Sequence, residues 1–265
     1  MPLILLLLAA AAPPNAGRPA APPPVIVRQG ERVPFALDHS AASRRDFVDG
    51  LKRSSGGAVF AAIERNFPDD YQALVDRLLD VAINAHGDAG AAATGGFRET
   101  YAFLRSKSAD ILNAPAASLM TVNDRTLALY RAAAATDVGF CGQFAVRGVT
   151  DPGALPRTLA SQMSAITIAM IEAAGAGHRA GEHPAGRGTI VPENAAAWMT
   201  RMRALDSTNE VVPLLANQGA LEQAAPALQC RVGTMIHEAI GGLPPEQGAS
   251  ILAYFLSLSF QTRQP

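Results

Sequence analysis

His237 and Glu238 are the first residues to consider for chemistry, because they match the first half of the His-Glu-x-x-His motif of zinc proteases. The second histidine of that motif belongs four positions after the first, where this chain has Gly241. The zinc motif is therefore incomplete. His237 remains the one candidate catalytic residue, as a general base near Cys230 on the same helix face. The alternative is a histidine that only packs in the core.

A second group of potential ligands lies in the glycine-rich stretch from Gly175 to Gly188. His178, Glu182 and His183 have the side chains that bind zinc and similar ions. A metal site needs three or four such groups at fixed positions, and a glycine-rich loop does not fix them. We therefore expect a solvated loop here, with these three residues as the candidate metal ligands if there is a site, and we expect no cofactor.

The two cysteines, Cys141 and Cys230, are the only ones in the chain. They are too far apart in sequence for a redox motif of the Cys-x-x-Cys kind. In an oxidising compartment a pair of this kind forms a structural disulfide. The sequence therefore predicts a Cys141–Cys230 cross-link, and the alternative is two separate buried thiols.

A small group of large, flexible apolar residues follows the glycine-rich stretch. Trp198, Met199 and Met202 are suited to line an adaptable pocket for an apolar ligand. Packing in the protein core explains the same three residues. The group is thus a candidate ligand pocket without a catalytic side chain of its own.

The elements that must position these residues are helices. Residues 226–241 have apolar positions at helical spacing, and Gly241 and Gly242 followed by Pro244 and Pro245 indicate a turn into another helix. Residues 247–262 carry no charge and are apolar around most of the helix circumference, which is typical of a buried helix. This apolar run is too short for a membrane span, so we expect no transmembrane helix after signal cleavage.

The rest of the chain predicts an all-α fold: a single irregular bundle of about eight to ten helices, joined by one disulfide and spanning residues 35–265. Residues 66–86 give the clearest amphipathic helix, and the segment of small residues from Gly87 to Gly96 is expected to interrupt the helical pattern. A short extended segment is expected at 25–33, with no second strand to pair with it.

The N-terminus predicts export. Residues 1–12 have the apolar core and small-residue end of a signal peptide, and residues 13–34 form a Pro/Ala-rich tether and an extended segment. Lysine occurs only at Lys52 and Lys107, whereas Arg, Ala, Gly and Pro are frequent, a bias typical of GC-rich bacterial sequences. We therefore expect a periplasmic or secreted bacterial protein.

Charge excludes one class of partner and leaves several functions open. The net charge of -1 offers no basic surface for nucleic acid. The leading hypothesis is a non-catalytic envelope or secreted module that binds a protein partner or an apolar small molecule between its helices. The alternatives are a hydrolytic enzyme that uses His237 or the His178, Glu182 and His183 group, and a structural homo-oligomer.

Overall fold

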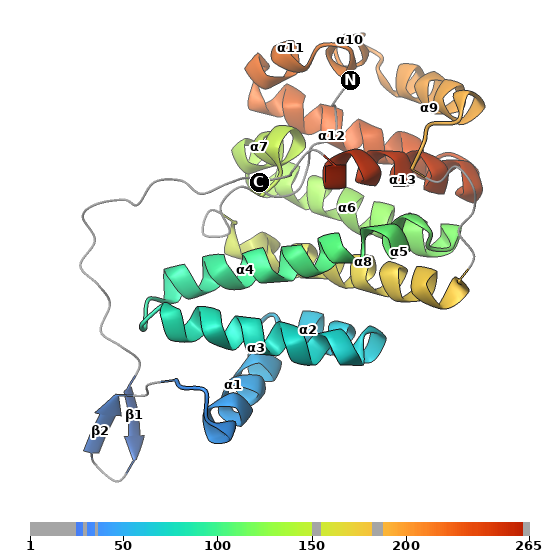
Figure 1. Ribbon diagram of the computed structural model, residues 1–265. Helices are drawn as coiled ribbons and strands as arrows, with labels where there is room; N and C mark the ends of the chain where they lie inside the picture. The colour runs from blue at the N-terminus through green and yellow to red at the C-terminus, as the bar shows by residue number, and fades with distance from the viewer. Residues whose placement is uncertain (1–24, 29–30, 35–36, 150–154, 182–187, 262–265) are drawn as a thin grey trace. The chain divides into compact units, whose positions relative to one another are not determined.

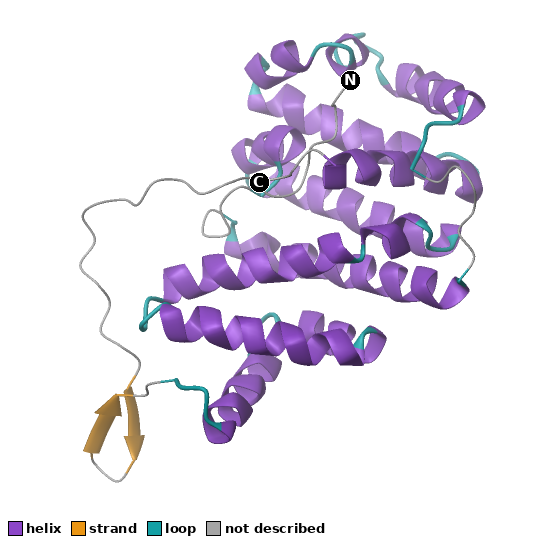
Figure 2. Cartoon of the chain, in the orientation of Figure 1, coloured by secondary structure: helices purple, strands orange, loops and turns teal. Residues whose placement is uncertain are grey.

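The computed structural model describes residues 25–28, 31–34, 37–149, 155–181 and 188–261. These residues are mostly helical (Figures 1 and 2) and form two compact units, one with the described residues up to Leu104 and the other with those from Arg105 onward. The predicted signal peptide at 1–12 and most of the predicted tether lie outside the described residues. The single helical domain from 35 to 265 stays a prediction.

The all-α class is confirmed, and the described residues contain thirteen α-helices. This exceeds the expected eight to ten because three helices, α5, α10 and α11, have only four to six residues. The helices of the first unit are α1 (Ala41–Arg53), α2 (Gly57–Asn66), α3 (Pro68–Asn84) and α4 (Ala89–Ser106). Those of the second unit are α5 (Ser108–Leu112), α6 (Ala116–Thr136), α7 (Val138–Arg147), α8 (Ala160–Ala180) after the short 3₁₀ turn η2 (Arg157–Leu159), α9 (Pro192–Leu205), α10 (Val212–Leu215), α11 (Gln218–Gln223), α12 (Pro226–Gly241) and α13 (Pro245–Gln261).

A short hairpin precedes the helices. Strand β1 (Val25–Arg28) pairs antiparallel with β2 (Glu31–Pro34), with Val25 opposite Pro34 and Arg28 opposite Glu31. The expectation of an unpaired extended segment was wrong, because the second half of that segment turns back and supplies the partner strand.

The first unit is built on α3, whose amphipathic pattern the sequence shows clearly. Tyr71, Leu74 and Leu78 on its apolar face are buried. The expected interruption between Gly87 and Gly96 was wrong, because α4 begins at Ala89 and continues through the rest of this segment. Gly95 lies so close to Val81 that a Cβ there would overlap its side chain, so the missing side chain allows α4 to approach α3.

The second unit surrounds α12, which contacts α6, α7, α9 and α13. In α12 the side chains of Val232, Ile236 and Ile240 are buried, and in α13 Ile251 and Leu252 are. The predicted pair of buried C-terminal helices with a turn between them is therefore present. Figure 1 shows α12 beside α13, and α6 packs against both of them.

The predicted disulfide is also present and joins α7 to α12 through Cys141 and Cys230. Both cysteines are buried. Beside the bond, a Cβ on Gly142 would overlap the backbone of Pro226, so the two helices meet at backbone distance. The cross-link holds the middle of the chain to the helix that carries His237.

Helix α8 corrects a second expectation about glycine. The stretch from Gly175 was predicted to be the least regular part of the interior, yet α8 continues through it to Ala180. The reason is packing against α5: Gly177 lies directly on the Asp110 carbonyl group and the Ala114 amide. Its missing side chain lets two helix backbones touch, which outweighs the low helix propensity of glycine.

Replacing Gly177 with alanine is expected to lower the free energy of unfolding by about 1–3 kcal/mol, because the new Cβ overlaps α5. Urea unfolding followed by circular dichroism measures the change. Gly219→Ala is the matched control, since Gly219 is exposed in α11 of the same unit and its Cβ meets only ordinary contacts. Equal stability of the two variants would contradict the packing account.

Among the described residues one segment, Arg157–Ala180, is long and apolar enough to cross a membrane by length and composition. Of its most apolar 18-residue window, 44% is buried within the fold. Core helices of proteins meet the same test, and α8 packs against α5 and α6.

Candidate functional site

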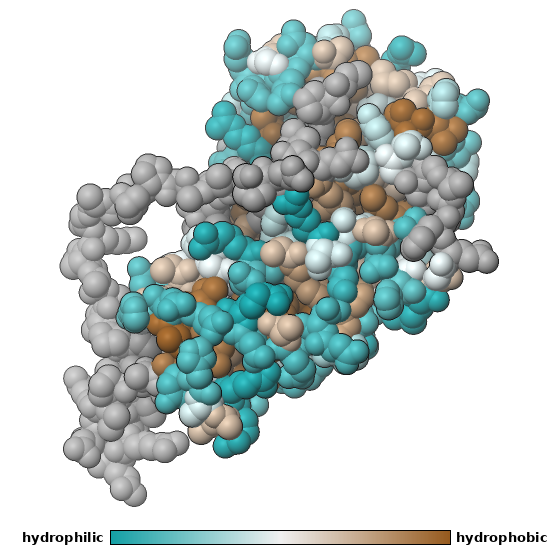
Figure 3. Space-filling model, viewed as in Figure 1, coloured by the Kyte–Doolittle hydropathy of each residue, from teal (hydrophilic) through white to brown (hydrophobic). Residues whose placement is uncertain are grey.

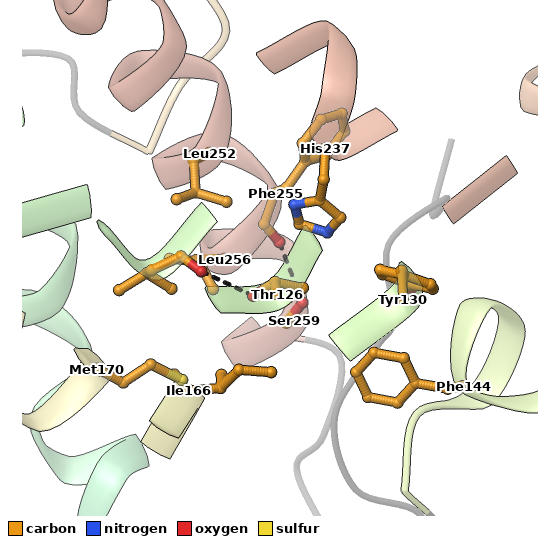
Figure 4. Close-up of a pocket in the computed structure, with 11 residues that line it drawn as sticks. Thr126, Tyr130, Phe144, Ile166, Met170, His237, Leu252, Phe255, Leu256 and Ser259 are labelled. Carbon is orange, nitrogen blue, oxygen red and sulfur yellow. Dashed lines mark hydrogen bonds between the residues drawn. The ribbon is translucent and has the colours of Figure 1, made fainter. Parts of the chain in front are cut away.

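A cavity of about 40 Å³ lies in the second unit among α6, α7, α8, α12 and α13. It has room for roughly three water molecules, or for an organic group of similar size. Its walls are largely aliphatic and aromatic (Figure 4), and they are formed by Val122, Thr126, Tyr130, Phe144, Ile166, Met170, His237, Leu252, Phe255, Leu256 and Ser259. Thr126 is half-buried, whereas the other lining residues with described burial are all buried. The cavity is therefore a mainly apolar interior site with few polar groups.

His237 is the basic group of this cavity. It comes from α12, is only 8% exposed, and extends into the cavity toward Thr126 and Ser259 (Figure 4). Burial lowers the pKa of His237 to about 4, because the charged imidazolium loses its hydration. The ring is therefore neutral at neutral pH.

Asn123 of α6 holds the imidazole in place. Its side-chain Nδ2 donates to the backbone carbonyl oxygen of His237 at 3.1 Å, and its Oδ1 lies 2.8 Å from His237 Nδ1. Asn123 itself is fully buried. These two contacts between one side chain and one residue fix the position of the imidazole ring. They join α6 and α12, which are far apart in sequence. Asn123 was not predicted as part of the site, because its charged and exposed neighbours Asp124 and Arg125 make this part of the chain look like a solvated helix face.

The hydroxyl groups of the cavity are held by their own helices. Thr126 donates to the carbonyl oxygen of Val122 at 2.9 Å, and Ser259 donates to that of Phe255 at 3.1 Å (Figure 4). Neither proton is directed at His237. The described residues near His237 thus offer an amide as its partner, where a catalytic triad would place a carboxylate and an activated hydroxyl.

Tyr130 forms the aromatic wall of the cavity. Its ring lies 5.5 Å from the imidazole of His237 and 5.0 Å from the ring of Phe144, measured between centroids. Gly233 of α12 lies directly against the Tyr130 ring, which a larger residue would displace. Burial raises the pKa of Tyr130 well above its usual value, so this side chain is neutral too.

The predicted pocket at Trp198, Met199 and Met202 lies outside this lining. Trp198 and Met202 are buried and Met199 is half-buried. Trp198 touches the cavity wall indirectly, through an edge-on contact of 5.2 Å between its ring and that of Phe255. The three residues are thus not part of the cavity lining, and their role as a ligand pocket stays a prediction.

The predicted metal group is described only in part. His178 lies on the last turn of α8 rather than in a loop, and its Nδ1 is 3.6 Å from an Asp110 carboxylate oxygen. Glu182 and His183 lie outside the described residues. Within the described part of the chain, no group of three His, Cys, Asp or Glu side chains is placed to hold a metal ion.

A shallower groove of about 350 Å³ lies on another side of α12, with Val138 and Leu205 exposed at its edge. Its charged residues are engaged: Arg231 pairs with Glu210 at 3.0 Å, and Glu238 pairs with Arg131 at 2.9 Å. On the face seen in Figure 3, apolar residues lie in small groups among hydrophilic ones. The cavity at His237 is the more enclosed of the two sites.

Comparisons with protein-family models, curated proteins and solved structures found no match to this chain. The class that the fold defines is an all-α protein whose middle and C-terminal helices are cross-linked by a disulfide.

Proposed function

We propose that this chain is an exported, non-catalytic binding protein that holds a small apolar molecule, or the apolar end of a larger one, in the cavity at His237. The observation that carries the proposal is the cavity itself: a space of about 40 Å³ with apolar walls and one fixed imidazole. Small-molecule sites commonly combine apolar walls with a few well-placed polar groups.

The size of the cavity bounds the ligand and its affinity. A group of three or four non-hydrogen atoms fits the volume, and the best small ligands gain at most about 1.5 kcal/mol per such atom. Four such atoms gain at most about 6 kcal/mol, so the expected dissociation constants are no tighter than roughly tens of micromolar, and millimolar values are ordinary for fragments of this size.

The acid-base properties of His237 favour binding over hydrolysis. A base whose pKa is about 4 takes up a proton poorly at neutral pH, whereas an efficient general base has a pKa near the working pH. The oxidised cysteine pair also leaves no thiol beside His237 to act as a nucleophile.

The disulfide supports the exported location. Structural disulfides persist in periplasmic and secreted proteins and are rare in reducing compartments. The predicted signal peptide at residues 1–12 supports the same periplasmic or secreted location.

Xenon tests whether the cavity accepts an apolar guest. On addition of xenon, methyl NMR signals of Val122, Ile166 and Met170 are expected to shift together, because their side chains line the cavity. Val122→Leu, which fills part of the space, is expected to weaken the shifts of Ile166 and Met170.

The matched control is Val211→Leu, since Val211 is equally buried in the same unit and does not line the cavity. This variant should leave the xenon shifts unchanged. If xenon moves no cavity methyl signal in the wild-type protein, the proposed binding function is wrong.

A further inference from the structure

The orientation of the Asn123 amide determines which nitrogen of His237 carries the proton. The backbone carbonyl oxygen of His237 only accepts hydrogen bonds, so the Asn123 atom that contacts it must be the amide Nδ2. The other end of the amide, Oδ1, then faces His237 Nδ1 at 2.8 Å. Because Oδ1 only accepts, Nδ1 must hold the proton and donate it.

The second nitrogen, Nε2, therefore carries a lone pair. The hydrogen bonds of the described residues give Nε2 no protein partner, although His237 is more than nine-tenths buried. Figure 4 shows the far edge of the ring extending into the cavity, and that edge holds Nε2. Nε2 is not among the fully enclosed side-chain atoms that lack a partner, so it is accessible from the cavity, and a ligand that donates a hydrogen bond there gains an interaction that an alkane does not.

Resting on the function proposed above, we propose that the ligand of this cavity is a neutral molecule that donates an O–H or N–H group to His237 Nε2. A small alcohol, or the hydroxyl end of a longer apolar molecule, has the required chemistry. An alkane or alkyl halide of the same size fills the same space and leaves Nε2 unpaired.

The surroundings disfavour a charged ligand. Tyr130 is the one other titratable side chain that lines the cavity among the described residues, and it is neutral. The remaining lining groups are apolar or are hydroxyls that donate to helix carbonyls. A carboxylate or ammonium group would lose its hydration here without meeting an opposite charge.

A pair of probes of similar size tests the donor requirement: 1-propanol, which donates a hydrogen bond, and 1-chloropropane, which does not. Each is titrated into the 15N,13C-labelled full chain at pH 7. Methyl signals of Ile166 and Met170 report that the cavity is filled. Long-range 1H–15N spectra report Nδ1 and Nε2 of His237 separately.

Before a probe is added, the spectrum of the wild-type protein is expected to show that Nδ1 of His237 is protonated and Nε2 is not. Propanol is expected to shift the Nε2 resonance, and chloropropane is expected to move the methyl signals while leaving Nε2 in place. One neutral hydrogen bond corresponds to roughly a three- to tenfold preference in the dissociation constant.

The variant that removes the acceptor replaces both partners, His237→Phe with Asn123→Leu, so that no buried amide is left unpaired. It is expected to lose the three- to tenfold preference for propanol while still binding both probes. Thr126→Val is the matched control, since it removes the half-buried hydroxyl group of the cavity and should retain the preference.

The outcomes separate the two proposals. Binding of neither probe contradicts the proposed function. Binding of both probes with no movement of the Nε2 resonance overturns the donor requirement alone, as does loss of the preference in Thr126→Val. The wild-type spectra test the donor requirement even if the double variant does not fold.

Discussion

Breaking the Cys141–Cys230 disulfide is expected to lower the free energy of unfolding by about 4 kcal/mol. The bond joins α7 to α12 across 89 sequence positions, so it restricts a large loop of the unfolded chain. In the chain-entropy model a disulfide stabilises the folded state by about 3 kcal/mol when it closes a loop of about 15 residues and by about 4.7 kcal/mol when it closes one of about 100 residues. The loop in this chain lies between these two lengths, near the longer one.

Urea unfolding of the Cys141→Ala/Cys230→Ala double variant, compared with the oxidised wild type, measures this loss. The wild type treated with a reductant serves as the control, because it keeps both sulfur atoms in place. Both samples should unfold at lower urea concentration, and the double variant should not respond to the reductant. A change below 1 kcal/mol in both samples would show that helix packing alone holds α7 on α12.

Acidification from pH 6.5 to pH 4 is expected to lower the free energy of unfolding by about 3 kcal/mol through His237 alone. In the folded chain burial lowers the pKa of His237 to about 4, whereas the unfolded imidazole titrates at 6.5. As the pH falls below 6.5 the unfolded state therefore takes up the proton first. The stability due to the neutral ring is complete above pH 6.5 and is lost as the pH approaches 4.

Urea unfolding at several pH values between 7 and 4 tests this dependence. In the His237→Phe/Asn123→Leu variant, the free energy of unfolding should no longer show the decrease between pH 6.5 and pH 4 that His237 causes. His178→Gln should keep most of the wild-type slope, because His178 is exposed and its contact with Asp110 is a surface ion pair. If the double variant and the wild type share one pH profile, His237 does not titrate as its burial requires.

The sequence allowed the framework of this fold to be predicted. An uncharged apolar run and a Gly-Gly-x-Pro-Pro turn were enough to place the two C-terminal helices, and an isolated pair of cysteines indicated the cross-link. These features are local, or follow from the number of cysteines. The short helices α5 and α11 were missed because five and six residues carry too little periodicity to recognise.

Glycine misled the prediction for a definite physical reason. Gly95 and Gly177 were treated as interruptions, although each allows a helix to lie against a neighbour at a distance that alanine would prevent. Whether a glycine breaks a helix or packs it depends on the element opposite, which lies elsewhere in the sequence. The α8 and α4 boundaries were wrong for this reason.

The candidate site shows the same limit. His237 was selected from its residue type and position, but its partner Asn123 is 114 positions away on another helix. Only the packing of α6 on α12 brings the amide to the imidazole and fixes the ring nitrogen that donates. The cavity likewise arises from five helices together, and no single segment predicts it.

The bridge between α7 and α12 also determines what a protease would leave behind. A cut at any peptide bond between Cys141 and Cys230 produces two polypeptides that sulfur still joins. For a cut between the two helices, the fragment that carries α7 would stay attached to the fragment that carries α12. The cavity residues Tyr130, Phe144 and His237 would therefore stay in one molecule. A nicked molecule would therefore run as two bands on a reducing gel and as one without reductant.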